Sequence, residues 1–143
     1  MEEWRLLDAE TPKNAAMNMA FDEAILLARI ERAISPTVRF WRNNRAAVIG
    51  YSQIVDAEVN LELCEEEGVQ VVRRLSGGGA VYHDLGNLNY TIVVDADHRL
   101  IRSLDIVESY RVLCSGVVEV LEKFGMNAKF RPVNDVLIRD KKV

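Results

Sequence analysis

The chain has 143 residues, 49% hydrophobic and 28% charged, a composition that is ordinary for a soluble globular protein. This length predicts one domain with its own core, and a net charge of −4 argues against a general nucleic-acid-binding protein, which would carry a basic face. No apolar signal core follows the first residues and no apolar stretch approaches membrane-spanning length, so we expect no membrane association and a cytoplasmic location.

The first third of the chain predicts a strand, a long helix and a hairpin. Residues 4–8 are typical of a strand, and apolar residues at three- and four-residue steps predict a helix over residues 14–32. Asp22 and Glu23 flank its apolar face, where we expect them either in solvent or paired with an arginine. The β-branched and aromatic runs 37–42 and 46–50, separated by Asn43 and Asn44 as turn residues, predict a hairpin, with Trp41 in the core.

The remaining elements complete an α+β pattern. Asn60 and Gly68 bracket a predicted short helix over 61–67, and Ser103 is the expected cap of a long helix that ends at Phe124. Strands are predicted at 69–74, 88–94, 128–131 and 135–138. Tight turns between neighbouring strands, together with two long amphipathic helices, predict a mixed, largely antiparallel sheet covered by helices.

The two cysteines and one histidine, His98, could carry chemistry, but we expect none of them to do so. Cys64 and Cys114 are neither a disulfide framework nor a zinc site by spacing, and their apolar, helical surroundings predict buried, reduced thiols. His98 lies in a polar stretch, where we expect it in solvent.

The most informative stretch joins the strands 69–74 and 88–94. Three consecutive glycines, Gly77–Gly79, follow Arg73 and Arg74. A triple glycine is costly in backbone entropy, and one reason to keep it is a ligand that lies on the main chain and accepts from its amides. The forked guanidinium group suits phosphates and carboxylates. A glycine-rich bulge without a ligand is the alternative, but the arginine pair favours an anionic, phosphate-bearing ligand.

The segment RRLSGGGAVYHDLGN, residues 73–87, resembles the signature of the lipoate–protein ligase A family of the biotin/lipoate ligase superfamily. Residues 18–23, 48–53 and 134–135 resemble other landmarks of that family in the same order. The resemblance implies the fold shared with biotin ligases and class II aminoacyl-tRNA synthetases. It also implies ATP-dependent activation of lipoate to lipoyl-AMP and transfer of the lipoyl group to a lysine of carrier domains, those of 2-oxoacid dehydrogenases and the glycine-cleavage H protein.

The resemblance also implies a set of site residues. Lys142 is the expected catalytic lysine and approaches the lipoyl carboxyl. Asp135 is either a ligand of Mg²⁺ that bridges phosphate oxygens or a turn residue after Asn134. For His83 we favour a hydrogen bond that orients the loop over general-base work, and Asn18 is implied to order the acyl site. Contacts to ATP or lipoyl-AMP are implied for Arg74, Gly77, Gly78, Gly79, Ala80, Val81, Tyr82, His83, Asn87 and Lys142.

The sequence stops at Val143, before the remaining catalytic domain and the small C-terminal domain of the family. We therefore expect one incomplete catalytic domain over 1–143, no C-terminal accessory domain, and activity that needs the missing part or a separate accessory chain. Two other functions stay open. One is an ATP-independent octanoyl or lipoyl transferase with a cysteine nucleophile, although neither cysteine adjoins a base. The other is a non-catalytic subunit that binds lipoyl-AMP with a partner chain.

Overall fold

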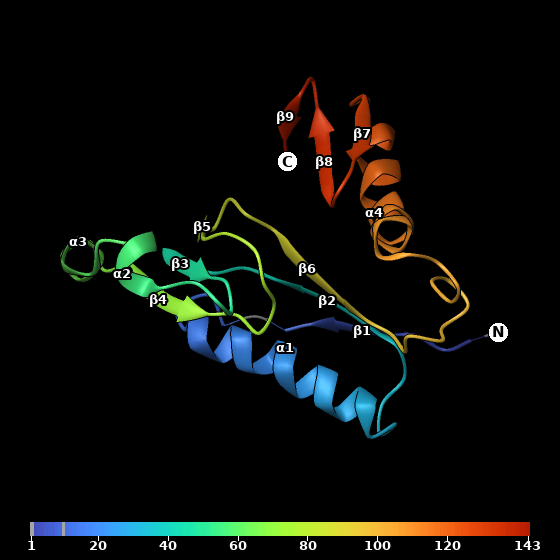
Figure 1. Cartoon of the computed structure of the whole chain (residues 1–143), viewed down its shortest axis with the longest axis horizontal. Coiled ribbons are helices and arrows are strands. Elements are labelled where there is room, and N and C mark those ends of the chain that lie inside the picture. The colour runs from blue at the N-terminus through green and yellow to red at the C-terminus, as the bar shows by residue number, and fades with distance from the viewer. Residues whose placement is uncertain (1, 10) are drawn as a thin grey trace. The chain divides into compact units, whose positions relative to one another are not determined.

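The computed structural model describes residues 2–9 and 11–143, which form two compact units that divide between Val94 and Asp95 (Figure 1). Of the six strand pairings in the described residues, four are antiparallel and two parallel. The predicted α+β class with a mixed, largely antiparallel arrangement is thus confirmed, with the strands divided among three three-stranded sheets. None of the helices in this part of the chain is long and apolar enough to cross a membrane.

Two three-stranded sheets form the first unit. One has the order β1 (Arg5–Asp8), β2 (Thr37–Trp41), β6 (Asn89–Val93), with β1 parallel and β6 antiparallel to β2. The other has the order β4 (Gln70–Arg73), β3 (Ala46–Ile49), β5 (Val81–His83), with β4 parallel and β5 antiparallel to β3.

The predicted hairpin of residues 37–42 and 46–50 is wrong. Both strands exist, but β2 and β3 belong to different sheets and do not pair with each other. The reason lies in the connection, where Asn43 is completely buried and its side chain bonds to Asn18 and His83. A tight hairpin turn leaves its asparagine in solvent. The connection between β2 and β3 instead buries Asn43 and carries the chain from one sheet to the next.

The helix α1 (Ala15–Ile30) lies along one face of the strands of this unit (Figure 1). It begins at Asn14, whose side chain accepts from the backbone N–H of Met17, a bond that satisfies one of the free amides of the first turn. A small core is formed where α1 meets β3 and β4, by Ala15, Ala46 and Val48 with Met19 and Val72 against them.

Two short helices precede β4. Asn60 caps α3 (Leu61–Glu66) as predicted, since its Oδ1 accepts from the N–H of Leu63, and Gly68 ends it at φ +63°. The single turn α2 (Val55–Glu58) was not predicted. It has no side-chain cap and no buried residue, so the sequence shows neither a capping residue nor an apolar face that would predict it.

In the second unit α4 (Ile106–Lys123) packs against β7 (Ala128–Arg131) and β8 (Asp135–Ile138). These two strands form an antiparallel sheet with β9 (Lys141–Lys142). The helix is capped by Asp105 and not by Ser103, because Asp105 Oδ1 accepts from the N–H of Glu108 while Ser103 sits at φ +64° in the preceding turn. The core includes Cys114, which is buried as predicted, whereas Cys64 in the first unit is only partly buried, so that part of the prediction is wrong. His98 is also buried, at 7% exposure, so its predicted solvent position is wrong.

Candidate functional site

A cavity of about 530 Å³ lies in the first unit beside the loop that contains the three glycines. This volume is within the range of small-molecule sites, which are typically apolar with a few convergent polar groups. Arg74, Ser76 and His83 supply polar groups to its wall. Its apolar lining comes from α1, four strands and the loops beside them, and includes Met19, Leu26, Trp41, Val48, Leu75, Val81, Leu88, Ile92 and Val93.

The glycine loop (residues 76–80) is held by Arg74 through its carbonyl groups. Arg74 Nη2 donates to the carbonyls of Gly77 and Gly79 at 2.7 and 2.9 Å, and Nε donates to Gly77 at 3.2 Å. Nη1 donates to the carbonyl of Val48 at 3.1 Å. In a trans peptide the next N–H points opposite to the carbonyl, so the amides of Gly78 and Ala80 point away from the guanidinium.

The glycines of the loop differ in what surrounds them. Gly78 lies at φ +95°, and its carbonyl oxygen is so close to Gly50 that a Cβ on Gly50 would lie 2.1 Å away. At Gly77 and Gly79, in contrast, an added Cβ would meet no atom within 4 Å. Packing therefore explains the glycines at 50 and 78, while those at 77 and 79 present bare main chain to open space.

Arg73 holds a second loop, residues 50–53, which follows β3 directly. Its Nη1 donates to the carbonyls of Gly50, Tyr51 and Gln53 at 2.8 to 2.9 Å. The N–H of Tyr51 then donates to the carbonyl of Ser76 at 2.9 Å, which ties this turn to the glycine loop. The two arginines predicted to bind an anion are thus both engaged in shaping main chain around the cavity.

His83 is the last residue of β5 and lies half-buried in the cavity wall. Its ring meets the indole of Trp41 edge to face, with ring centroids 5.9 Å apart. Asn43 Nδ2 lies 3.3 Å from its Nδ1. Burial, and secondarily the positive charge of Arg74, lower the pKa of His83 below its ordinary value, because both disfavour the imidazolium form. The hydrogen bond that we favoured for His83 is present.

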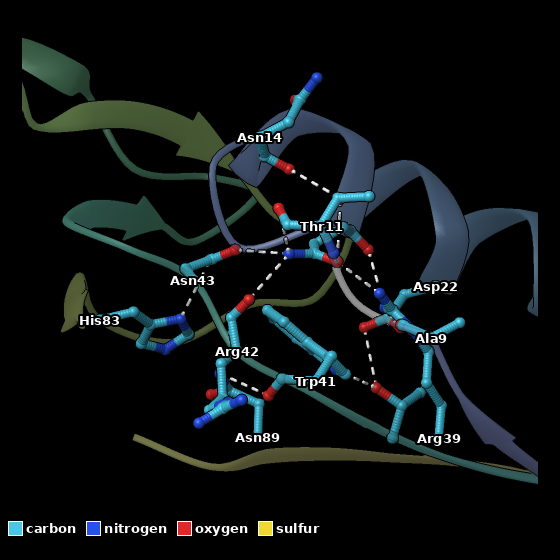
Figure 2. Close-up of polar contacts among 12 residues, drawn as sticks. Ala9, Thr11, Asn14, Asp22, Arg39, Trp41, Arg42, Asn43, His83 and Asn89 are labelled. Atoms are coloured by element: carbon cyan, nitrogen blue, oxygen red, sulfur yellow. Dashed lines mark hydrogen bonds and ion pairs between the residues drawn. The ribbon is translucent and has the colours of Figure 1, made fainter. Parts of the chain in front are cut away.

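A buried polar network lies behind this histidine (Figure 2). Arg39 and Asn18 are completely buried, and Arg39 Nη1 forms an ion pair with Asp22 Oδ1 at 2.6 Å. Asp22 Oδ2 accepts from the hydroxyl of Thr91, which in turn accepts from Trp41 Nε1. Asp22 thus has the arginine partner that was one of its two predicted roles. Arg39, Asn43 and Thr91 were not singled out from the sequence, where a strand arginine and a turn asparagine carry no special signal.

Three other predicted binding positions are absent from the wall of this cavity. Ala80 and Tyr82 line a separate hollow of about 380 Å³, together with Cys64, while Val81 between them lines both spaces. Asn87 closes a turn, where its Oδ1 accepts from the N–H of Asp84 at 3.0 Å.

Lys142 and Asp135 lie together in the second unit. Lys142 Nζ is 2.7 Å from Asp135 Oδ1, and Arg131 Nη2 is 2.7 Å from Oδ2. These two hydrogen bonds lower the pKa of the Asp135 carboxyl, with Lys142 as the larger cause. Both carboxylate oxygens are therefore bound to cationic side chains, and the described residues contain no group of three or more His, Cys, Asp or Glu side chains around a common point. A Mg²⁺ ion at Asp135 would have to displace one of these two cationic side chains.

The chain is similar to known proteins over nearly its whole length. The family model described as the lipoyl protein ligase A/B catalytic domain matches residues 14–143. Lipoate-protein ligase A subunit 1 of Thermoplasma acidophilum is 40% identical over 136 residues, which are 95% of this chain and 50% of that protein. Octanoyltransferase LipM of Brevibacillus brevis is 39% identical over 130 residues, 90% of this chain and 46% of that protein.

Solved structures give the same result. A bi-partite lipoate protein ligase with its E2 lipoyl domain, from Thermoplasma acidophilum, superposes with a TM-score of 0.87 at 39% identity, over 100% of this chain and 55% of that one. A lipoate-protein ligase A bound with ATP gives 0.83 at 37% identity, over 99% and 59%. The chain thus spans about half the length of the relatives it matches. It belongs to the lipoyl protein ligase A/B catalytic domain family.

Proposed function

We propose that this chain carries the acyl-adenylate site of a lipoate–protein ligase. In that reaction a lipoate carboxylate oxygen attacks the α-phosphorus of ATP and displaces pyrophosphate, giving lipoyl-AMP. The amino group of a carrier lysine then attacks the acyl carbon, expels AMP and loses a proton as the amide forms. The site must supply donors for the phosphate oxygens and a dry space for the acyl chain.

One observation carries this proposal: an arginine-held glycine loop stands beside a cavity whose lining is mainly apolar. The amides of Gly77–Gly79 donate to no other group in the described residues, so they are available to an acceptor from outside. Arg74 lies behind the loop and adds positive charge where phosphate would bind. The cavity walls, with Trp41 and Val48, suit an aliphatic acyl chain. Arg74 therefore acts on the phosphate mainly through the loop that it shapes.

A relative that is a lipoate-protein ligase A bound with ATP supports the same choice of nucleotide. The ATP-independent alternative, an octanoyl transferase, is supported by similarity to octanoyltransferase LipM. Such an enzyme needs a nucleophilic thiol at the acyl carbon. Cys64 lines the separate hollow and Cys114 is buried in the core of the second unit. Neither cysteine lies at the cavity of the glycine loop, so within the described residues no thiol is placed for that step.

The partners of the proposed enzyme follow from its relatives. One of them is a bi-partite ligase that was solved with its E2 lipoyl domain, so we propose a lipoyl domain as acceptor and a second chain as part of the active enzyme. We propose the glycine-cleavage H protein as a further acceptor, on the resemblance alone. Lys142 is proposed as the catalytic lysine, which requires that it leave its ion pair with Asp135.

Pyrophosphate exchange tests the proposed reaction. With the complementary part of the ligase supplied, labelled pyrophosphate should exchange into ATP only when lipoate is present. Exchange without lipoate, or none in the complete enzyme, would refute the ligase. Formation of a hydroxylamine-sensitive thioester from octanoyl carrier protein without ATP would establish the transferase instead.

Single glycine variants test the site. Because a methyl group at Gly77 or Gly79 meets no protein atom, Gly77→Ala and Gly79→Ala should fold normally. The methyl group would instead keep the ligand from approaching the main chain, so each variant should bind a lipoyl-sulfamoyl-adenosine analogue at least about tenfold more weakly, about the value of one charge-assisted hydrogen bond. Gly116→Ala, at an exposed position of helix α4, is the matched control and should leave affinity unchanged. Equal affinity in all three variants would place the ligand elsewhere.

A further inference from the structure

Three completely buried polar side chains, Arg39, Asn18 and Asn43, connect α1 and β2 to His83 (Figure 2). Buried polar groups need partners of the right kind, because an unmatched donor or acceptor costs free energy. An arginine can only donate, an amide donates from nitrogen and accepts at oxygen, and a neutral imidazole does one at each ring nitrogen. These rules fix the direction of every bond in this chain of contacts.

The direction is set at Arg39. Its Nη2 donates to Asn18 Oδ1 at 2.5 Å, and the backbone N–H of Thr11 donates to the same oxygen at 3.3 Å. The oxygen of Asn18 must therefore face these two donors. Its Nδ2 faces the opposite way, toward the carbonyl of Arg42 at 3.0 Å and toward Asn43 at 2.8 Å.

The orientation of the Asn18 amide fixes that of Asn43, which in turn fixes the hydrogen bond to His83. It must present Oδ1 to the donating nitrogen of Asn18, so its own Nδ2 faces His83 Nδ1 at 3.3 Å. An amide nitrogen can only donate, so Nδ1 must accept and cannot carry a hydrogen. The proton of the neutral ring then lies on Nε2. An imidazolium ring would set an N–H of His83 against an N–H of Asn43.

We infer that Arg39, Asn18 and Asn43 form a directional hydrogen-bond relay that fixes His83 as the neutral tautomer with its proton on Nε2, a donor for the acyl carbonyl oxygen of the ligand. His83 lines the cavity, and within the described residues no group accepts from Nε2. The tautomer follows from the contacts alone, whereas the identity of the oxygen rests on the proposed function.

The charges around the relay support a neutral ring. Arg74 is the charged group that acts on His83 directly, and it disfavours a second positive charge. At the far end Arg39 is paired with Asp22, so the relay begins from a neutralised arginine. A neutral N–H among apolar wall residues suits a carbonyl oxygen, and this bond strengthens as negative charge develops there during attack on the acyl carbon. The phosphate is left to the glycine loop.

The ring nitrogen chemical shifts of His83 test the relay in the 143-residue chain. The protein has only two histidines, so His98 serves as an internal reference. We expect His83 Nε2 at the position of a protonated nitrogen and Nδ1 at that of a bare one, with a titration midpoint below the ordinary value of about 6.5. A proton on Nδ1, or an even mixture of tautomers, would overturn the relay.

A matched pair of variants tests the direction of the last bond. In Asn43→Asp the carboxylate still accepts from Asn18 but offers His83 an acceptor, so the ring should gain a proton on Nδ1 and bind it at least about tenfold more tightly. Asn44→Asp makes the same change at the next residue, outside the relay, and should leave His83 as in the unmodified protein. The same tautomer and midpoint in both variants would refute the relay. If Asn43→Asp does not fold, the tautomer of the unmodified chain decides the matter.

A second NMR experiment, with ligand added, separates this inference from the proposed function. Adding the lipoyl-sulfamoyl-adenosine analogue should shift the amides of the glycine loop and the Nε2–H signal of His83 together. Loop shifts without a change at Nε2 would overturn the donor role of His83. No loop shift would refute the proposed ligand, while the relay would still stand or fall with the measured tautomer.

Discussion

The substitution Asp22→Asn measures how far the buried Arg39 depends on a charged partner. The Arg39 side chain is 0% exposed and that of Asp22 22%, with Nη1 and Oδ1 2.6 Å apart. Asparagine has the same shape but cannot replace both contacts. Arg39 and the hydroxyl of Thr91 each donate to one carboxylate oxygen, and one of them would face the new amide nitrogen, which itself donates.

The expected loss is about 3 kcal/mol of unfolding free energy. Removal of one partner from a buried ion pair costs roughly 3–5 kcal/mol. The lower end applies because Arg39 keeps its bonds to the carbonyls of Ala9 and Asn18 and lies 5.0 Å from the ring centres of Phe21 and Trp41. The partial exposure of Asp22 also lets water approach the charge.

Urea unfolding followed by tryptophan fluorescence is a suitable assay. Both tryptophans, Trp4 and Trp41, precede Val94, so the signal reports the unit that contains the network. Glu23→Gln is the matched control, since Glu23 is the exposed next residue on the same helix and its change should stay within about 0.5 kcal/mol. A loss below about 1 kcal/mol for Asp22→Asn would show that the other contacts of Arg39 suffice without the charge.

Three further substitutions are predicted from local geometry. Gly50→Ala should lower the unfolding free energy by about 1–3 kcal/mol, because its methyl group would collide with the carbonyl of Gly78; urea unfolding measures this, and Gly77→Ala, which meets no atom, is the control. Gly116→Ala should stabilise the protein by up to about 1 kcal/mol, since Gly116 lies at an exposed position inside helix α4 with room for a methyl group. For Asp135→Asn, thermal unfolding across pH should show a variant less stable than the unmodified protein at pH 7 and equally stable in strong acid. The pKa of Asp135 is depressed in the folded state, so its ion pairs stabilise the fold above the unfolded pKa of about 4. This stabilisation is lost as the pH falls through the folded pKa.

The glycine loop and its arginine neighbours could be located from the sequence because their signals are local. Three glycines beside two arginines are unusual within a strand pattern, and β4 and β6 fall where the β-branched runs predict them. Helix starts were predictable where one capping residue stood alone, as at Asn60. They were not where two candidates were close, as with Ser103 and Asp105, because only the backbone geometry decides between them.

The polar network behind the loop could not be predicted, because its meaning depends on contacts distant in sequence. Asn43 reads as a turn residue until Asn18 and His83 lie on either side of it. Arg39 reads as an exposed strand residue until Asp22 faces it from α1. A direct contact between Arg74 and phosphate was expected from its charge and from the family resemblance. The structure instead shows its three nitrogens donating to main-chain carbonyls, a use that no local pattern distinguishes.

The adjacent residues Arg73 and Arg74 have a consequence for how this region can evolve. Each guanidinium fastens a different loop, one through Gly50, Tyr51 and Gln53 and the other through Gly77 and Gly79. Since successive side chains leave an extended chain in opposite directions, inserting a single residue between them would send both the same way and release one rim. A length change at this peptide bond should therefore be rejected.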